Sequence, residues 1–228
     1  MTRILAFDTS TEALSVALAD GAQVWRADEA GGAKASARLI PAIEGLMREA
    51  GLRYDQLDAI AFGAGPGSFT GLRTACSVAQ GLGFGAGVRL LPIDSLLAVA
   101  EDARQRHGAR RILAALDARM NQLYVARYQF AEDGSYEQSG DFALVAPEAL
   151  VTGGHVLAGN ALAAYRDRLP ADALQGALES LPTAVAMLRL APRLIEAGAT
   201  VAPEDALPRY VRDKVAQTTL ERMAAAKQ

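Results

Sequence analysis

Apolar residues along the chain gather in short runs that alternate with longer segments of helical spacing. The short runs predict strands over residues 4–8, 59–62, 88–93, 112–117 and 155–158, and the segment 139–145 looks like a further strand. Apolar positions that recur every three or four residues predict helices over residues 35–50, 95–106, 160–169 and 183–197. Because strands that alternate with helices are typical of sheets covered by helices, the pattern predicts an α/β fold.

One strand–Asp–turn–strand unit occurs twice. In the first copy, an apolar run ends at Asp8 and a polar turn leads to the alternating segment 14–18. In the second copy, the run ends at Asp117 and a turn leads to the segment 123–127. Repetition near half the chain length predicts a duplicated protein, with one lobe over residues 1–107 and another over 108–228. Each lobe is expected to hold a mixed sheet that begins antiparallel and continues parallel.

A glycine-rich segment, residues 63–73 (GAGPGSFTGLR), joins a predicted strand to a predicted helix. Such a segment can bring backbone N–H groups close to a phosphate. Its glycines can instead permit a tight turn, with Ser68 capping the helix. The helix that follows is rich in small residues, and each glycine weakens an isolated helix by up to about 1 kcal/mol. Because these residues lower the stability of the helix, their presence indicates a further role. We interpret the helix as one that another helix approaches closely.

Composition narrows the function classes. The chain has 228 residues, of which 51% are hydrophobic and 21% charged, close to ordinary globular usage. A net charge of −3 argues against a protein that grips a nucleic-acid backbone by itself. The single cysteine, Cys76, excludes an internal disulfide and fits a reducing cytoplasm. No apolar run approaches the roughly 18–20 residues that span a bilayer, so we expect a cytoplasmic protein without a membrane segment.

Four strings in the chain resemble the TsaB (YeaZ) family. They are residues 7–11 (FDTST), 65–73 (GPGSFTGLR), 116–120 (LDARM) and 208–212 (PRYVR), and they stand in the family's order and spacing from end to end. The resemblance implies an actin/Hsp70/sugar-kinase fold with two related lobes that face a cleft. It also implies a cytoplasmic role in forming threonylcarbamoyladenosine beside the anticodon of tRNA.

Within that role, the resemblance implies a non-catalytic scaffold or activator. The expected partners are the transferase TsaD and the P-loop ATPase TsaE, with a homodimer when TsaD is absent and with tRNA met only indirectly. TsaD-type subunits carry a His-x-x-x-His pair for a metal, and the corresponding positions here are Ser95 and Val99. The histidines His107 and His155 are far apart, so neither a catalytic metal nor the old metalloprotease label of this branch is supported.

Nucleotide binding is a separate question. In this superfamily the turns after the two repeated aspartates hold phosphates and a cation, which makes candidate ligands of Asp8, Thr9, Ser10 and Asp117. The second turn, however, has no glycine that would let the backbone approach a phosphate. We therefore expect no intrinsic cofactor, and ATP or ADP only at a site shared with a partner. The alternative is a small-molecule kinase or ATPase of the same fold, with Asp117 as base.

The docking surface for the partner is predicted on two helices of the first lobe. One is the helix over 35–50 and the other follows the glycine-rich segment. The residues expected to contact the partner are Leu39, Ile43, Met47, Gly71, Ala75, Val78, Ala79 and Leu82.

Overall fold

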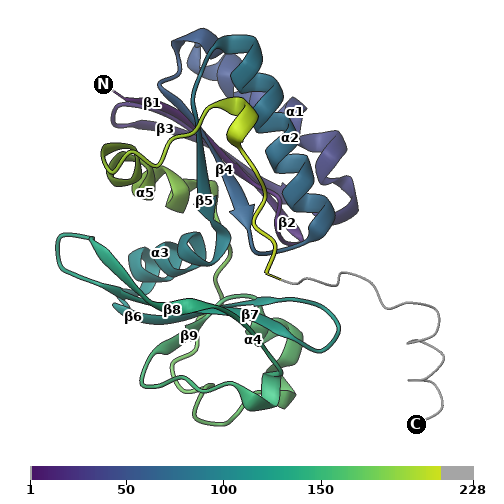
Figure 1. The fold of residues 1–228 in the computed structure, drawn as a ribbon, viewed down its shortest axis with the longest axis vertical. Coiled ribbons are helices and arrows are strands. Elements are labelled where there is room, and N and C mark those ends of the chain that lie inside the picture. Colours follow the sequence, from purple (N-terminus) through teal and green to yellow (C-terminus); the bar gives the residue numbers. More distant parts are fainter. Residues whose placement is uncertain (1, 212–228) are drawn as a thin grey trace.

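The computed structural model describes residues 2–211, except for the side chain of Ala33. It contains two mixed sheets, one above the other (Figure 1). The first has the order β3-β2-β1-β4-β5, made of β1 (Arg3–Asp8), β2 (Ala13–Asp20), β3 (Gln23–Ala30), β4 (Ala59–Gly65) and β5 (Leu90–Asp94). The second has the order β8-β7-β6-β9, made of β6 (Arg111–Asp117), β7 (Leu123–Phe130), β8 (Tyr136–Val145) and β9 (Val156–Ala158).

Strand pairing confirms the predicted duplication. In the first sheet β1 pairs antiparallel with β2 and parallel with β4. In the second sheet β6 pairs antiparallel with β7 and parallel with β9. The repeated aspartates, Asp8 and Asp117, end the corresponding strands β1 and β6. The expected α/β fold with two related mixed sheets is therefore correct.

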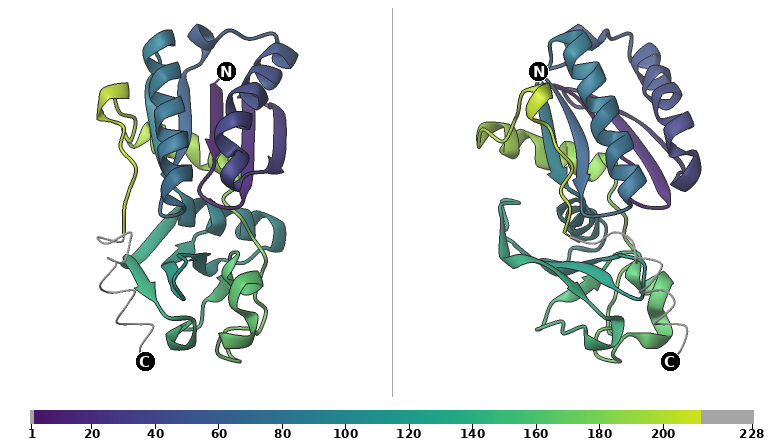
Figure 2. Two further views of the ribbon diagram at one scale, coloured as in Figure 1. Left: turned by 90° about the vertical axis from the view of Figure 1, so that its right-hand side faces the viewer. Right: turned by 45° about the vertical axis from the view of Figure 1, so that its right-hand side comes forward.

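Helices cover both sheets and separate them. They are α1 (Ala35–Ala50), α2 (Phe69–Ala86), α3 (Ser95–His107), α4 (Ala161–Tyr165) and α5 (Ala184–Glu196), with short 3₁₀ turns at Gly32–Lys34, Tyr54–Gln56, Pro147–Ala149, Arg166–Arg168 and Pro203–Asp205. One apolar cluster joins α1 and α2 to one face of the first sheet. A second cluster joins the other face to α5, α3 and the second sheet. Figure 2 shows α1 and α2 side by side over the first sheet. Among the described residues, no helix is long and apolar enough to cross a membrane.

The last described part of the chain returns to the first sheet. The Ala184 amide at the start of α5 donates to Ser15 Oγ at 2.9 Å. Residues 199–211, here called the C-terminal strap, then pair with β5, where Val201 and Leu90 exchange two backbone hydrogen bonds of 2.8 and 3.0 Å. The strands of the second sheet all follow residue 107 in the sequence. Helix α5 and the strap also follow residue 107, but they pack on the first sheet. The division into 1–107 and 108–228 stays a prediction, and Arg212 of the motif 208–212 lies outside the described residues.

Most elements appear where the apolar pattern predicts them. The helix expected over 35–50 is α1, with the same bounds and with Gly51 as its left-handed cap. Ser68 caps α2, accepting a hydrogen bond from the Gly71 amide, as expected. One strand was not predicted: β3 is the edge of the first sheet and is mostly exposed, so its residues carry no buried face for the pattern to reveal.

Candidate functional site

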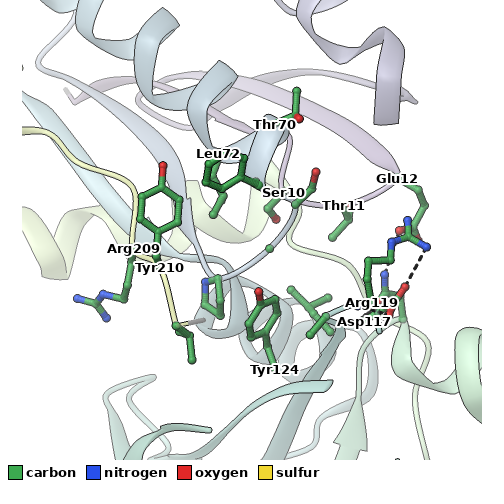
Figure 3. Close-up of a pocket in the computed structure, with 18 of the residues that line it drawn as sticks. Ser10, Thr11, Glu12, Thr70, Leu72, Asp117, Arg119, Tyr124, Arg209 and Tyr210 are labelled. Carbon is green, nitrogen blue, oxygen red and sulfur yellow. Dashed lines mark hydrogen bonds and ion pairs between the residues drawn. The ribbon is translucent and has the colours of Figure 1, made fainter. Parts of the chain in front are cut away.

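A cavity of about 330 Å³ lies between the two lobes. The first lobe contributes the β1–β2 turn and the start of α2, the second contributes the β6–β7 turn and Tyr124, and the strap closes one side. Figure 3 shows the two ends of this cavity, with Arg209 and Tyr210 at one end and Glu12, Asp117 and Arg119 at the other. This is where the superfamily resemblance places a nucleotide.

Asp8 is an internal group of the first turn. Its side chain is buried, and its Oδ1 accepts hydrogen bonds of 2.7 Å from both the amide and the hydroxyl of Ser10. Its Oδ2 accepts from the Ser95 hydroxyl at 3.0 Å. Burial raises the pKa of Asp8 to about 6, although these hydrogen bonds act in the opposite direction. In the isolated chain the Asp8 carboxylate lies behind the cavity lining and is already engaged, so its role as a cofactor ligand stays a prediction.

Thr9 is also buried behind the lining. Its hydroxyl donates to the carbonyl oxygen of Gly71 at 2.7 Å. A Cβ on Gly71 would lie 1.8 Å from the Thr9 carbonyl oxygen, and a Cβ on Gly63 would lie 1.8 Å from Asp8 Oδ2. These two glycines are therefore required by contacts inside the first lobe. Of the first-turn candidates only Ser10 lines the cavity, and its hydroxyl is bound to Asp8.

Asp117 is the candidate ligand that the structure does place in the cavity. Its Oδ1 accepts hydrogen bonds of 2.8 Å from the Arg119 amide and from the Tyr165 hydroxyl. Its Oδ2 lies 3.1 Å from the Arg119 guanidinium, as the dashed line in Figure 3 marks. Asn160 accepts from the Asp117 amide and donates to Glu12 Oε2 across the cleft, both at 2.9 Å. The chain's own groups therefore already surround this carboxylate.

The second turn has an unusual backbone. Arg119, Met120 and Asn121 have φ angles of 58°, 53° and 59°, a left-handed conformation that side chains disfavour by roughly 1–2 kcal/mol per residue. The turn brings the side chains of Arg119 and Met120 into the cavity lining. It is stabilised in part by Arg168, whose guanidinium donates to Asn121 Oδ1 at 2.7 Å.

An aromatic cluster at the other end of the cavity was not predicted. The rings of Phe69 and Tyr210 lie 5.4 Å apart, and the Arg73 guanidinium lies 3.7 Å above the Phe69 ring. Arg73 Nε also donates to the Tyr210 hydroxyl at 3.0 Å. The sequence showed both partners as parts of motifs, 65–73 and 208–212, but gave no sign that segments so far apart in sequence lie together.

No metal centre is visible in the residues described. Ser95 and Val99, which correspond to the TsaD-type histidine pair, are both fully buried. Within residues 2–211 no group of three or more His, Cys, Asp or Glu side chains could hold a metal ion.

The predicted docking residues need a correction. Six of the eight lie in the core of the first lobe, namely Leu39, Ile43, Met47, Gly71, Ala75 and Ala79. An amphipathic helix turns its apolar face toward its own sheet, so the same residues cannot contact a partner. Val78 and Leu82 remain partly exposed. The outward face consists of exposed residues on α1 and α2, among them Ile40, Ser77, Gly81, Phe84 and Gly85.

Two related α/β lobes that face a shared cleft define this chain as a protein of the actin/Hsp70/sugar-kinase class. The family model described as TsaD: tRNA N6-adenosine threonylcarbamoyltransferase matches residues 31–219. The tRNA threonylcarbamoyladenosine biosynthesis protein TsaB of Escherichia coli K12 is 36% identical over 94% of this chain and 96% of its own length. The TsaB protein of Haemophilus influenzae is 35% identical over 93% and 94%. The chain therefore belongs to the TsaB (YeaZ) family.

A solved structure agrees with this assignment. YeaZ from Pseudomonas aeruginosa has 37% sequence identity and superposes with a TM-score of 0.84 over 92% of this chain and all of its own.

Proposed function

We propose that the chain is a non-catalytic accessory subunit in the cytoplasmic assembly that adds a threonylcarbamoyl group to the adenosine beside the anticodon of tRNA. The names of its relatives connect the family to this biosynthesis. The non-catalytic role is supported by one observation above all. Where TsaD-type subunits carry a histidine pair, Ser95 is fully buried and donates its hydroxyl proton to Asp8.

The proposed main partner is TsaD, which binds through the outward face of α1 and α2. Ile40 and Phe84 are large apolar side chains with exposed fractions of 47% and 61%. Next to Phe84, α2 presents Gly81 and Gly85, and no atom lies within 4 Å of a Cβ built on either glycine. A partner helix can therefore approach the α2 backbone closely there. TsaE is proposed to join this pair, tRNA to be bound through the partners, and the same face to form a homodimer when TsaD is absent.

Charge substitutions on this face test the docking proposal. Phe84→Asp and Ile40→Asp each place a carboxylate within the proposed contact, and TsaD binding measured by calorimetry is expected to weaken at least tenfold. Both side chains are exposed, so the circular dichroism spectrum is expected to stay unchanged. Val151→Asp is the matched control, since Val151 is 66% exposed and lies in the second lobe. Equal affinities for wild type and Phe84→Asp contradict the proposed surface.

We further propose that the chain holds no nucleotide by itself, and that ATP or ADP binds only at a site shared with a partner. The support is the state of the candidate ligands: Asp8 and Thr9 are buried, and Asp117 is bound by Arg119 and Tyr165. Calorimetry with ATP is expected to give no heat for the lone chain and a binding isotherm for the assembled complex. Tight binding of ATP by the lone chain favours the kinase or ATPase alternative instead.

A further inference from the structure

Contacts between the lobes occur at both ends of the cavity. At one end, Asn160 of the second lobe donates to Glu12 of the first lobe at 2.9 Å. At the other end, Arg209 of the strap reaches both lobes. Both Glu12 and Arg209 line the cavity, and Figure 3 shows them on opposite sides of it. The mouth of the cleft is thus bridged twice by side chains of the chain itself.

Arg209 makes three contacts that together join strap, first sheet and second sheet. Its amide donates to the Ala64 carbonyl oxygen of β4 at 2.7 Å, and its guanidinium lies 2.8 Å from Asp94 Oδ1 at the end of β5. The same guanidinium lies 5.2 Å from the ring centre of Phe142 on β8. A guanidinium that pairs with a carboxylate on one side and an aromatic ring on the other holds the two in a defined geometry.

The strap itself is firmly placed against the first lobe. The Ala206 carbonyl oxygen accepts from Gln80 Nε2 at 3.1 Å and from Cys76 Sγ at 3.4 Å, both on α2. Gly65 has a φ of 111°, and a Cβ on it would lie 2.7 Å from the Arg209 carbonyl oxygen. The glycine-rich segment therefore makes room for the strap, and this positions Arg209 at the cleft.

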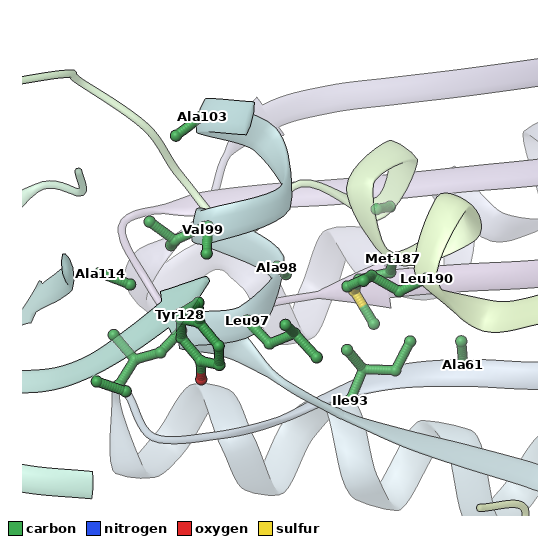
Figure 4. Close-up of a cluster of buried hydrophobic side chains, with 14 of the residues drawn as sticks. Ala61, Ile93, Leu97, Ala98, Val99, Ala103, Ala114, Tyr128, Met187 and Leu190 are labelled. Carbon is green, nitrogen blue, oxygen red and sulfur yellow. The ribbon is translucent and has the colours of Figure 1, made fainter. Parts of the chain in front are cut away.

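A buried hydroxyl on the second sheet lies next to this contact. Tyr128 on β7 is fully buried, and within the described residues its hydroxyl has no hydrogen-bond partner. Figure 4 shows its ring against the residues of α3. Burial raises the pKa of Tyr128, and the nearby Asp94 carboxylate adds to that effect. The Tyr128 ring thus belongs to the apolar contact between the second sheet and α3, beside the Arg209–Asp94 pair.

We propose that the Glu12–Asn160 contact and the Arg209 contact act as a clasp that holds the two lobes at one angle around the cavity. Helix α3 is packed between the sheets and forms the hinge, and Asp94, the residue that Arg209 contacts, lies at its N-terminus. Releasing the clasp lets the second sheet rotate about α3. The cleft is then held by side chains of the chain rather than by a ligand. This proposal does not rest on the proposed function, because it concerns the isolated chain.

Electron–electron distance measurements between spin labels test the clasp. Labels are placed at Arg48→Cys on α1 and Glu137→Cys on β8, two exposed positions in different lobes, while the native Cys76 is buried. The wild-type background is expected to give one narrow distance distribution. Exposed contacts are individually weak, so Glu12→Ala and Arg209→Ala are each expected to broaden the distribution slightly, and the double variant to widen it at least twofold.

Two controls separate the clasp from a general loss of charge. Arg38→Ala and Glu132→Ala each remove one partner of an exposed ion pair within a single lobe, and together they are expected to leave the distribution narrow. Arg209→Lys keeps the charge but loses the planar contact with Phe142, and an intermediate width is expected. An unchanged distribution in a folded Glu12→Ala/Arg209→Ala variant overturns the proposal, as does equal broadening in the control pair. If the double variant does not fold, a wild-type width for Arg209→Lys overturns it.

Discussion

Replacing Asp8 by asparagine is expected to change how the stability of the protein depends on pH. The carboxyl is buried, and its pKa is raised from 3.8 to about 6 in the folded protein. The folded state therefore binds more protons than the unfolded state between about pH 4 and pH 6. The free energy of unfolding of the wild type then falls as the pH rises through this window. The shift corresponds to a loss on the order of 3 kcal/mol.

Asparagine keeps an oxygen acceptor for Ser10 and cannot ionise, so Asp8→Asn lacks this pH dependence. Urea unfolding, followed by the fluorescence of Trp25 in β3, gives the free energy of unfolding of both proteins at pH 4, 5, 6 and 7. Any cost of altered hydrogen bonds is the same at each pH. The difference, variant minus wild type, is expected to rise by about 2 kcal/mol from pH 4 to pH 7. The exposed Asp141→Asn is the control, with a constant difference expected. A constant difference for Asp8→Asn refutes the burial argument.

Two further changes, each with a control variant, test the contacts of the glycine-rich segment. Gly71→Ala is expected to lower the free energy of unfolding by about 2 kcal/mol or more, since the new Cβ meets the Thr9 carbonyl oxygen at 1.8 Å. The matched control is Gly81→Ala on the same helix, whose new Cβ meets no atom within 4 Å, and it is expected to raise the free energy of unfolding by about 0.5–1 kcal/mol. If urea unfolding ranks the two variants in the opposite order, the placement of Gly71 against Thr9 is contradicted. Arg73→Ala removes the guanidinium from Phe69 and the donor to Tyr210, and a loss of about 1 kcal/mol is expected, whereas the exposed Arg53→Ala is expected to stay within about 0.5 kcal/mol of wild type.

Periodicity along the chain predicted the elements that bury one face. The helix α1 and the repeated hairpin that ends in Asp8 or Asp117 were found from apolar spacing, because burial against a sheet imposes that spacing. The edge strand β3 was not predicted, because few of its side chains are buried. The packing of α5 and the strap on the first sheet was not predicted either, since contacts between segments distant in sequence leave no local pattern.

The candidate site was predicted less well than the fold. The sequence indicated Asp8 and Thr9 as ligands, but their burial depends on the packing of the glycine-rich segment against the first turn. The docking residues were chosen as the apolar face of two helices, and the structure shows that this face serves the core of the lobe. Gly81 and Gly85 lie on the outward side of α2, and the expectation that another helix approaches α2 closely stays a prediction.

The accessory role is tested most directly by the initial rate of threonylcarbamoyl transfer to tRNA in a reconstituted system. TsaD, TsaE, ATP and threonylcarbamoyl adenylate are kept constant while this chain is omitted and then added back in steps. The expected rate is low without the chain and rises to a plateau at one copy per TsaD, whereas the chain without TsaD gives no transfer. Full transfer without the chain, or transfer by the chain without TsaD, contradicts the accessory role.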